Sequence, residues 1–179
     1  MNVKAARLSV PVSTSDHIEG RADAPVTLVE YGDYECPHCG HAYPIVKRIQ
    51  ARLGPALRFA FRNFPLSEAH PHALAAAEIA EAAALQDKFW PMHDALFEHQ
   101  TALDDQHLAQ YARSLDLNVA KLQAALRSDA PKERVRADFM SGVRSGVNGT
   151  PTFFIDGLRF DGDWTNEDAF VEALQSSVS

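Results

Sequence analysis

Cysteine, long apolar runs and an excess of positive charge are all scarce or missing in this chain of 179 residues. No run approaches the roughly 20 apolar residues that a membrane-spanning helix needs. The formal net charge of −7 argues against nucleic acid or an anionic membrane as the main partner. With 46% hydrophobic and 23% charged residues, the composition is that of an ordinary globular protein.

The first fifteen residues contain no apolar stretch of signal-peptide length. Lys4 and Arg7 supply positive charge, but the apolar run over residues 8–12 is short and broken. We treat residues 1–15 as an N-terminal tail and expect a cytoplasmic protein. A chain that begins at a processed N-terminus would look the same, and its compartment would then be periplasmic or otherwise extracytoplasmic.

The only two cysteines stand together in Cys36-Pro37-His38-Cys39, where an apolar strand is expected to run into a helix. Cys-x-x-Cys at the start of a helix brings both sulfurs to the first turn, close enough to form a disulfide without moving the backbone. Unpaired N–H groups and the helix dipole favour a thiolate there. We therefore expect a pair that cycles between dithiol and disulfide, with no third thiol to interfere and no other cofactor.

Two other interpretations of the pair are weaker. A zinc site needs two further Cys or His ligands, and no second cysteine pair exists. His38 and His41 lie too close in sequence to complete a tetrahedron, although His70 and His72 could arrive from elsewhere. A purely structural disulfide would close so short a loop that it removes little entropy from the unfolded chain. The expected strand and helix around the pair favour redox chemistry without a metal.

The residues around the pair predict a strand–helix–strand unit. Residues 16–25 are polar and are expected to form a lead-in loop. The β-branched run 26–31 is typical of a buried strand. The following helix over 37–53 begins at a proline, whose missing N–H costs nothing in the first turn. Residues 57–64 alternate strictly and predict a second strand, which completes a right-handed βαβ unit.

From about residue 65 to 129 the sequence changes to Ala-rich segments with helical periodicity. Asn118 is expected to cap the last of these helices. The four predicted helices cover residues 73–85, 88–99, 105–115 and 119–127.

A helix, a strand, a hairpin and a helix are predicted after this region. Thr150-Pro151 introduces the strand, and Asp156-Gly157 is a strong hairpin signal. The predicted helices cover 131–146 and 166–174, and the predicted strands cover 147–155 and 158–160.

This order of elements predicts the α/β class: a thioredoxin-like fold with an inserted all-helical subdomain. The core would be formed by residues 16–64 and 130–179, and the inserted subdomain by residues 65–129. The alternative is an all-helical domain beside a small α/β domain. That arrangement would leave two β halves that are each too small to fold alone.

Several motifs match a known family. The chain resembles the DsbA-like thioredoxin-fold proteins through the segment from Val29 to Cys39, which ends in Cys-Pro-His-Cys, and through the segment from Gly149 to Gly157, which contains Gly-Thr-Pro-Thr. Three segments between them are also similar to members of that family: 62–66, 70–73 and 89–93. The resemblance covers about residue 16 to the end, and the first two motifs together are highly specific.

The resemblance implies a thiol–disulfide oxidoreductase. In such a protein Cys36 attacks or is attacked, and Cys39 resolves the mixed disulfide. Pro151 would be in cis and would face the cysteine pair, and the backbone of Thr150 would offer a short strand edge to an extended peptide. Pro37, Thr150 and Pro151 are therefore the expected substrate-binding residues.

His38 is the expected electrostatic partner of the Cys36 thiolate. Three features are expected to lower the pKa of Cys36: the helix N-terminus, the N–H groups of His38 and Cys39, and the imidazole of His38. A stabilised thiolate stabilises the reduced form, which makes the disulfide more oxidising. The Pro-His dipeptide thus resembles the oxidase branch of the superfamily. The other interpretation of His38 is a solvated loop histidine.

Glu30 is the expected proton carrier for Cys39, whose thiol should be shielded until the mixed disulfide forms. It lies six residues before Cys36, where related folds place a buried acid, and on the strand face shared by Val26 and Leu28. Burial would raise the pKa of Glu30 toward neutrality. The alternative is a carboxylate at the strand end, in water.

Two residues weaken the oxidase interpretation. Glu35 adds a negative charge that works against the thiolate, and Thr150 before Pro151 is shared with isomerase and reductase members. Three histidines that could approach the cleft are instead expected to be surface or structural residues: His41, His70 and His93. Three aromatic residues are expected either to line a peptide groove or to pack in the core: Tyr34, Phe64 and Phe154.

The leading hypothesis is a protein dithiol oxidase that exchanges disulfides with cysteine-containing polypeptides and is reset by an unidentified redox partner or by glutathione. One alternative is a disulfide reductase or isomerase in a reducing cytoplasm. The other is a non-catalytic peptide- or zinc-binding module. No nucleic acid, membrane or metal is expected as a partner, and the lack of a dimerisation segment before the core favours a monomer.

Overall fold

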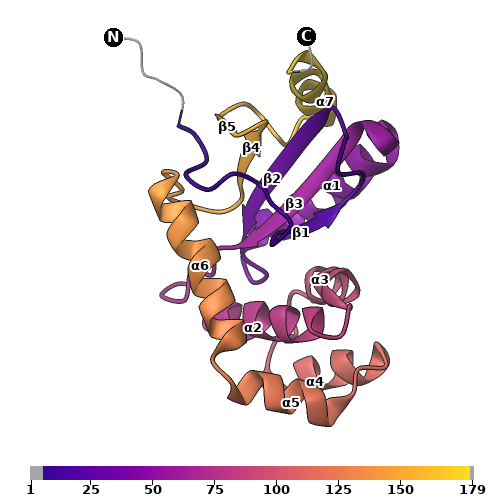
Figure 1. The fold of residues 1–179 in the computed structure, drawn as a ribbon, viewed down its shortest axis with the longest axis vertical. Helices are drawn as coiled ribbons and strands as arrows, with labels where there is room; N and C mark the ends of the chain where they lie inside the picture. The colour runs from indigo at the N-terminus through magenta and orange to yellow at the C-terminus, as the bar shows by residue number, and fades with distance from the viewer. Residues whose placement is uncertain (1–5, 178–179) are drawn as a thin grey trace.

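Five strands form one mixed sheet in the computed structural model, which describes residues 6–177 (Figure 1). Their spatial order is β1-β3-β2-β4-β5. Strands β2 and β3 are parallel, and the other neighbours are antiparallel. The strands are β1 (His17–Glu19), β2 (Val26–Gly32), β3 (Leu57–Asn63), β4 (Thr152–Ile155) and β5 (Leu158–Phe160).

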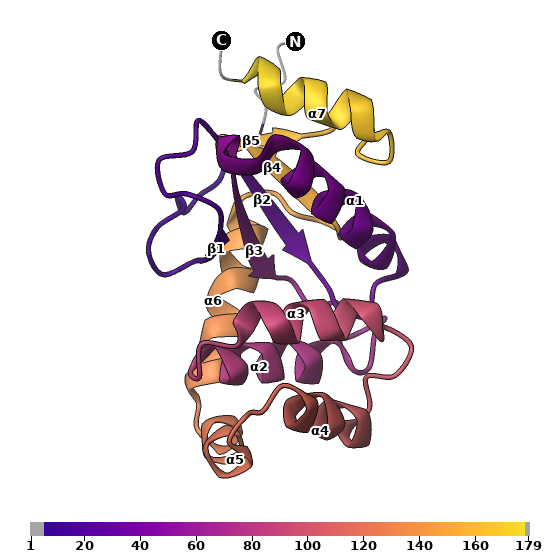
Figure 2. The ribbon, with the colours of Figure 1, turned by 90° about the vertical axis from the view of Figure 1, so that its right-hand side faces the viewer.

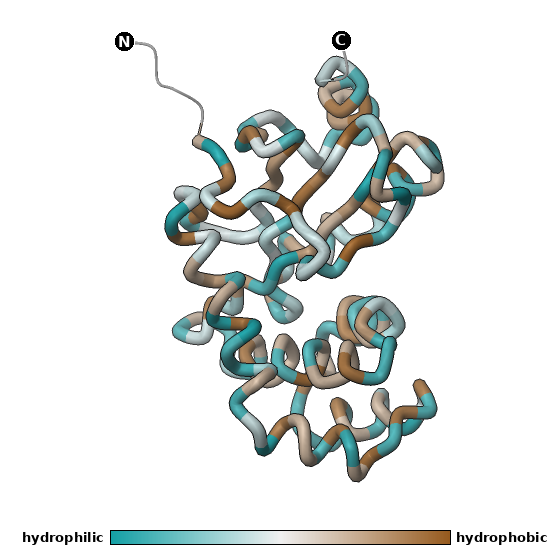
Figure 3. The backbone as a smooth tube through the Cα atoms, in the orientation of Figure 1, coloured by the Kyte–Doolittle hydropathy of each residue, from teal (hydrophilic) through white to brown (hydrophobic). Residues whose placement is uncertain are grey.

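Helices cover both faces of the sheet (Figure 2). On one face lie α1 (Pro37–Leu53), which ends in a 3₁₀ turn at Gly54–Ala56, and α7 (Glu167–Ser176). On the other face lies α6 (Ala130–Arg144), whose Phe139 packs against the aromatic ring of Phe64. Each face of the sheet thus has its own hydrophobic core. Strand β2 contributes to both cores, because successive residues of a strand point to opposite sides. Colouring by hydropathy shows apolar stretches along these central strands (Figure 3).

The predicted Ala-rich region forms four helices beyond one end of the sheet (Figures 1 and 2). Helix α3 also contacts α1, where the Tyr43 ring of α1 stacks on the Phe97 ring of α3. Asn118 caps the last of the four with its side chain, as predicted. The boundaries at residues 65 and 129 stay a prediction. The four helices are α2 (Ala73–Ala84), α3 (Phe89–Glu98), α4 (Asp105–Ser114) and α5 (Val119–Arg127).

Two predictions about the backbone are wrong. The expected lead-in loop contains a strand, β1, which pairs antiparallel with β3; its polar residues suit an edge strand held by main-chain bonds. The expected strand 147–155 begins only at Thr152. Pro151 has no N–H for the ladder, and the Thr152 hydroxyl donates to the Gly149 carbonyl at 2.7 Å, which closes a bend there.

The described part of the N-terminal tail lies beside the hairpin of β4 and β5. The Leu8 N–H donates to the Gly157 carbonyl at 2.9 Å, and the Arg159 N–H donates to the Ala6 carbonyl at 2.8 Å. Residues 1–5 lie outside the described residues. Among the helices of residues 6–177, none is long and apolar enough to cross a bilayer.

Candidate redox site

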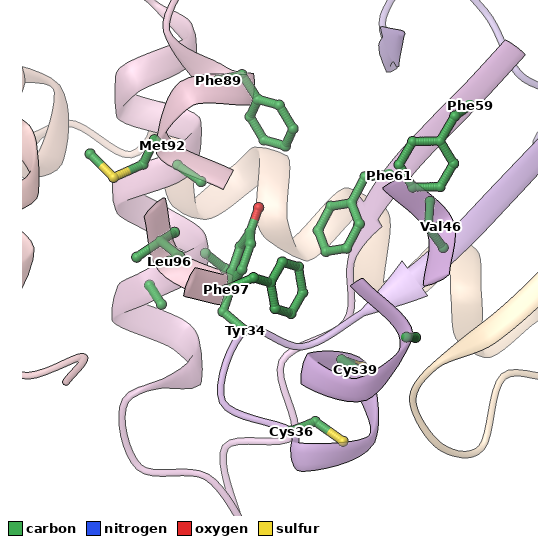
Figure 4. Packing of buried hydrophobic residues seen from close by; sticks show 14 of the residues in the cluster. Tyr34, Cys36, Cys39, Val46, Phe59, Phe61, Phe89, Met92, Leu96 and Phe97 are labelled. Atoms are coloured by element: carbon green, nitrogen blue, oxygen red, sulfur yellow. The ribbon is translucent and has the colours of Figure 1, made fainter. Parts of the chain in front are cut away.

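The cysteine pair lies where β2 ends and α1 begins. Cys36 is the N-cap of α1, and Pro37 takes the first helical position. The Cys36 N–H donates to the Asp33 carbonyl at 3.2 Å, and the Cys36 carbonyl accepts from the Gly40 N–H at 3.0 Å. Figure 4 shows Cys36 at the helix start and Cys39 one turn in, next to the buried aromatic side chains. Both sulfurs are free thiols in this structure.

Hydrogen bonds lower the pKa of the Cys36 thiol from its ordinary 9.0 to about 5. The largest contribution comes from the Cys39 thiol, followed by the side chain of Thr150 and the backbone N–H groups of Cys39 and His38. Burial works against these bonds, because it disfavours a charged sulfur. The donors prevail, so that Cys36 is a thiolate at neutral pH.

The segment around Thr150 approaches the outer sulfur from more than a hundred residues away in sequence. The Cys36 thiol contacts the Thr150 carbonyl oxygen at 3.4 Å, and the peptide bond between Thr150 and Pro151 is cis. The Thr150 hydroxyl is buried and has no other partner among the described residues. The sequence-predicted residues Cys36, Thr150 and Pro151 are therefore brought together at one site.

Cys39 is the inner, shielded thiol. It is 0% exposed, and its sulfur accepts a contact of 3.4 Å from the Asp33 N–H. Burial raises the pKa of Cys39 well above its ordinary value, and the neighbouring charges of Glu30 and Cys36 raise it further. The two sulfurs thus differ strongly: one is poised as a thiolate, and the other keeps its proton.

Glu30 is buried on β2, as the sequence analysis predicts. Only 2% of the residue is exposed, and its Oε1 atom has no hydrogen-bond partner within residues 6–177. Burial raises the pKa of Glu30 from 4.5 to about 8, and the Cys36 charge adds to this. Gly32 leaves room beside it, since a Cβ there would lie 3.2 Å from Oε1 and 2.5 Å from the Phe61 ring.

Pro37 and His38 lie on the exposed side of the site. The His38 backbone N–H helps to lower the pKa of Cys36, as expected. In the part of the chain that the structure describes, however, the His38 imidazole makes no hydrogen bond, and it is not among the causes that lower this pKa. An electrostatic role for its side chain stays a prediction.

The sequence analysis missed two carboxylate–histidine pairs beside the cysteines. Asp33 accepts a hydrogen bond from His70 Nδ1 at 2.7 Å, and Glu35 is paired with His72 Nδ1 at 2.8 Å. The expectation that His70 is a surface or merely structural residue therefore overlooks its place at the site. The sequence signal for these pairs is His70-Pro71-His72, whose spacing of two residues matches that of Asp33 and Glu35.

Gln100 was also missed. Its Nε2 atom donates to the Tyr34 carbonyl at 3.0 Å and to the Cys36 carbonyl at 2.7 Å, and it thereby fastens the helical group to the redox turn. Gly40 makes this approach possible, because a Cβ there would lie 2.2 Å from the Gln100 side chain. Nothing in the local sequence around a single glutamine after a helix could have shown this contact.

The remaining candidates belong mostly to the core. Tyr34, Phe64 and Phe154 are at most 3% exposed, so that they pack inside the protein and do not line an open groove. His93 is 2% exposed and bonds to the Tyr34 hydroxyl at 3.1 Å, while His41 is exposed. No group of three or more metal-ligating side chains occurs among residues 6–177.

Comparison with known proteins places this geometry in context. A family model described as thioredoxin matches residues 13–175. Oxidised BdbD from Bacillus subtilis superposes with a TM-score of 0.83 at 24% identity, and the match covers 98% of this chain and 99% of that one. A thioredoxin-like oxidoreductase from Silicibacter pomeroyi gives 0.76 at 25% identity, with 91% and 94% covered. Wolbachia pipientis α-DsbA1 gives 0.80 at 18% identity, with 96% of each chain covered. The predicted thioredoxin-like fold is confirmed.

The curated relatives in sequence are much longer proteins. The chain is 42% identical over 172 residues to Na(+)/H(+) antiporter NhaA 3 of Salinispora tropica, a match that covers 96% of this chain and 26% of that protein. It is 46% identical over 149 residues to Na(+)/H(+) antiporter NhaA of Herminiimonas arsenicoxydans, with 83% and 24% covered. The chain thus spans about a quarter of the length of these relatives.

Proposed function

Because the chain belongs to the thioredoxin family and its fold is similar to that of DsbA-like proteins, we propose that it is a thiol–disulfide oxidoreductase that acts as a dithiol oxidase on cysteine-containing polypeptides. The observation that favours oxidation over reduction of the client is the set of hydrogen bonds around Cys36, which lower its pKa to about 5. A stabilised thiolate stabilises the dithiol form, which drives the disulfide form to accept electrons from a client.

The reaction begins when a client thiolate attacks the Cys36 sulfur of the Cys36–Cys39 disulfide. A client–Cys36 bond forms, the Cys36–Cys39 bond breaks, and the Cys39 sulfur leaves with the electron pair. A second client thiolate then attacks the first client sulfur, and Cys36 leaves as the stabilised thiolate. The client loses two electrons and the pair gains them. A low pKa makes Cys36 a good leaving group in the second step.

Glu30 is the proposed proton carrier of this cycle. Its pKa of about 8 means that it holds a proton at neutral pH in the dithiol state. The sulfur of Cys39 must gain a proton when it leaves, because its pKa is raised well above the ordinary value by burial. A protonated carboxyl group in the same buried region, with an oxygen free of other partners, is suited to supply it.

We propose that the client binds at the outer rim of the site. Pro37 is exposed, and Thr150 and Pro151 are half-buried next to the outer sulfur. An extended client segment could pair with main-chain groups beside Thr150 and bring its cysteine to Cys36. The proposed partner that resets the pair is a further redox protein or glutathione.

The direction is tested with the disulfide form of the protein and an equimolar, reduced, unfolded polypeptide that contains two cysteines. We expect the client thiols to disappear while Cys36 and Cys39 become accessible to alkylation, as followed by mass. The reductase alternative predicts the reverse: the client stays reduced, and the dithiol protein instead opens an oxidised client. A protein inert in both directions would leave only the binding-module interpretation.

A further inference from the structure

Two acidic residues lie within three residues before the outer cysteine, and two histidines from another segment face them. Asp33 and Glu35 belong to the turn between β2 and α1, whereas His70 and His72 belong to the loop between β3 and α2. His70 Nδ1 is 2.7 Å from Asp33 Oδ2, and His72 Nδ1 is 2.8 Å from Glu35 Oε1. The sequence separation of 37 residues within each pair is the same, so the two segments run alongside each other in register.

Asp33 is the more deeply enclosed of the two acids. Its side chain is 0% exposed, and it accepts hydrogen bonds from the Leu66 N–H at 2.9 Å and the Glu35 N–H at 2.8 Å. Its own backbone N–H contacts the Cys39 sulfur. The side chain of Glu35 is 20% exposed and also accepts from the His72 N–H at 2.6 Å. Both carboxylates are therefore held rigidly beside the redox turn.

Unbalanced, these carboxylates would oppose the thiolate. Like charges within a few ångströms disfavour each other, and the effect is largest where water is excluded. The start of helix α1 favours the thiolate through its backbone N–H groups, but the first turn contains no Lys or Arg, and the basic residue of the last turn, Arg52, lies at the far end. The charges that can balance Asp33 and Glu35 come from the loop that contains His70 and His72.

The histidines are placed to be protonated. The pKa of His70 is raised by its hydrogen bond and charge attraction to Asp33 and by the charges of Cys36 and Glu35, against a contrary effect of burial. The pKa of His72 is raised chiefly by its hydrogen bond to Glu35, and Asp104 and Asp105 at the start of α4 add to it. These are the charged groups that act most strongly on the two rings, and they come from the turn before α1 and from the start of α4.

We propose that His70 and His72 are positioning residues that cancel the charges of Asp33 and Glu35, and thereby allow Cys36 to remain a thiolate beside two acids. The inference deepens the proposed function and rests on it, because a stable thiolate matters only if the pair exchanges disulfides. It also reassigns the cationic partner of the site: the imidazoles that balance the charge come from the loop after β3 and not from within the Cys-Pro-His-Cys motif.

The test is the pKa of Cys36 in the dithiol protein, measured from thiolate absorbance or from the pH dependence of its alkylation rate. His70→Asn keeps a neutral donor near the position of Nδ1 and removes the charge. We expect it to raise the pKa of Cys36 by roughly one unit, a tenfold higher proton affinity. For His72→Asn we expect a smaller rise of about half a unit, about threefold, because that ring is 45% exposed.

A matched control removes a cation from a carboxylate pair elsewhere. Arg21 bonds to Asp23 at 2.7 Å and lies before the start of β2, whereas Cys36 follows its end, roughly 20 Å away along the strand. Arg21→Gln should leave the pKa of Cys36 unchanged. An equal shift in this variant would overturn the proposal, because it would show a general effect of net charge.

Rescue separates charge balance from a merely structural role. The double variant Glu35→Gln with His72→Asn removes both charges of one pair, and we expect it to return the pKa of Cys36 to the wild-type value or below. If the ion pair only holds the loop in place, the pKa of Cys36 in the double variant should be raised as much as in His72→Asn alone. That outcome, or an unchanged pKa in folded His70→Asn, would refute the proposal.

These readouts are independent of client turnover. A protein that fails to oxidise any client but shows the expected shifts would refute the proposed function and leave the charge balance standing. If the protein oxidises clients normally while His70→Asn leaves the pKa of Cys36 unchanged, the charge balance is refuted and the proposed function stands. Circular dichroism of each variant confirms that the comparison is made between folded proteins.

Discussion

Cys36→Ser is expected to abolish thiol–disulfide exchange, with a loss of at least about 1,000-fold in the rate of client oxidation. The reason is chemical: a serine hydroxyl neither forms a disulfide nor leaves as a stable anion. Because Cys36 contacts the Thr150 carbonyl and is the sulfur with the lowered pKa, no other group in residues 6–177 can replace it. The measurement is the loss of free client thiols over time.

Cys39→Ser is the matched variant, and it should fail differently. This variant retains the reactive outer sulfur but lacks the buried Cys39 thiol that displaces a bound client from Cys36. Mixed disulfides with a client or with glutathione should therefore accumulate at Cys36. Intact mass and peptide mapping identify the adduct. If neither variant loses activity, or if the adduct accumulates at Cys39 in Cys36→Ser, the assignment of outer and inner sulfurs is wrong.

The second large effect is a pH-dependent difference in stability between the two redox forms. The pKa of Cys36 is lowered from 9.0 in the unfolded chain to about 5 in the folded dithiol form. A lowered folded pKa contributes stability that is fully present above the unfolded value and is lost as the pH falls through the folded value. Between about pH 7 and pH 4, the dithiol form should therefore lose roughly 2 to 3 kcal/mol relative to the disulfide form.

Urea unfolding of both forms at each pH measures this difference. The entropy of closing the disulfide loop does not depend on pH and cancels in the comparison between the two pH values. Glu30 has the opposite sign: its raised pKa contributes stability below 4.5 that is lost as the pH rises through about 8. Comparing both redox forms at each pH removes most of that effect. A difference that stays flat between pH 7 and pH 4 would contradict a stabilised thiolate.

Local patterns are sufficient to predict most of the fold and the centre of the site. Pro37 after a β-branched strand marks the start of α1 in the sequence itself, and this placement explains why Cys36 is outer and Cys39 inner. Asn118 likewise predicts the start of a helix, and Asp156-Gly157 predicts a hairpin. The burial of Glu30 follows from its place on a strand that is buried on both faces.

Other features depend on contacts between distant segments, which no local pattern encodes. Strand β1 exists because β3 offers it an edge, and buried Arg62 is tolerated because Asp16 pairs with it at 2.7 Å. The pairing of His70 with Asp33 requires the loop after β3 to return beside the turn before α1. The sequence alone predicts that Glu35 opposes the thiolate, because it does not show that His72 pairs with Glu35 in space.

The most direct test of the central claim is the reduction potential of the Cys36–Cys39 pair, measured by equilibration with glutathione buffers and alkylation. A thiolate stabilised by Cys39, Thr150 and the start of α1 makes the disulfide a strong oxidant. We predict a potential above about −180 mV, the range of oxidising dithiol proteins. A potential near about −270 mV, typical of a reductase, would contradict the proposed function.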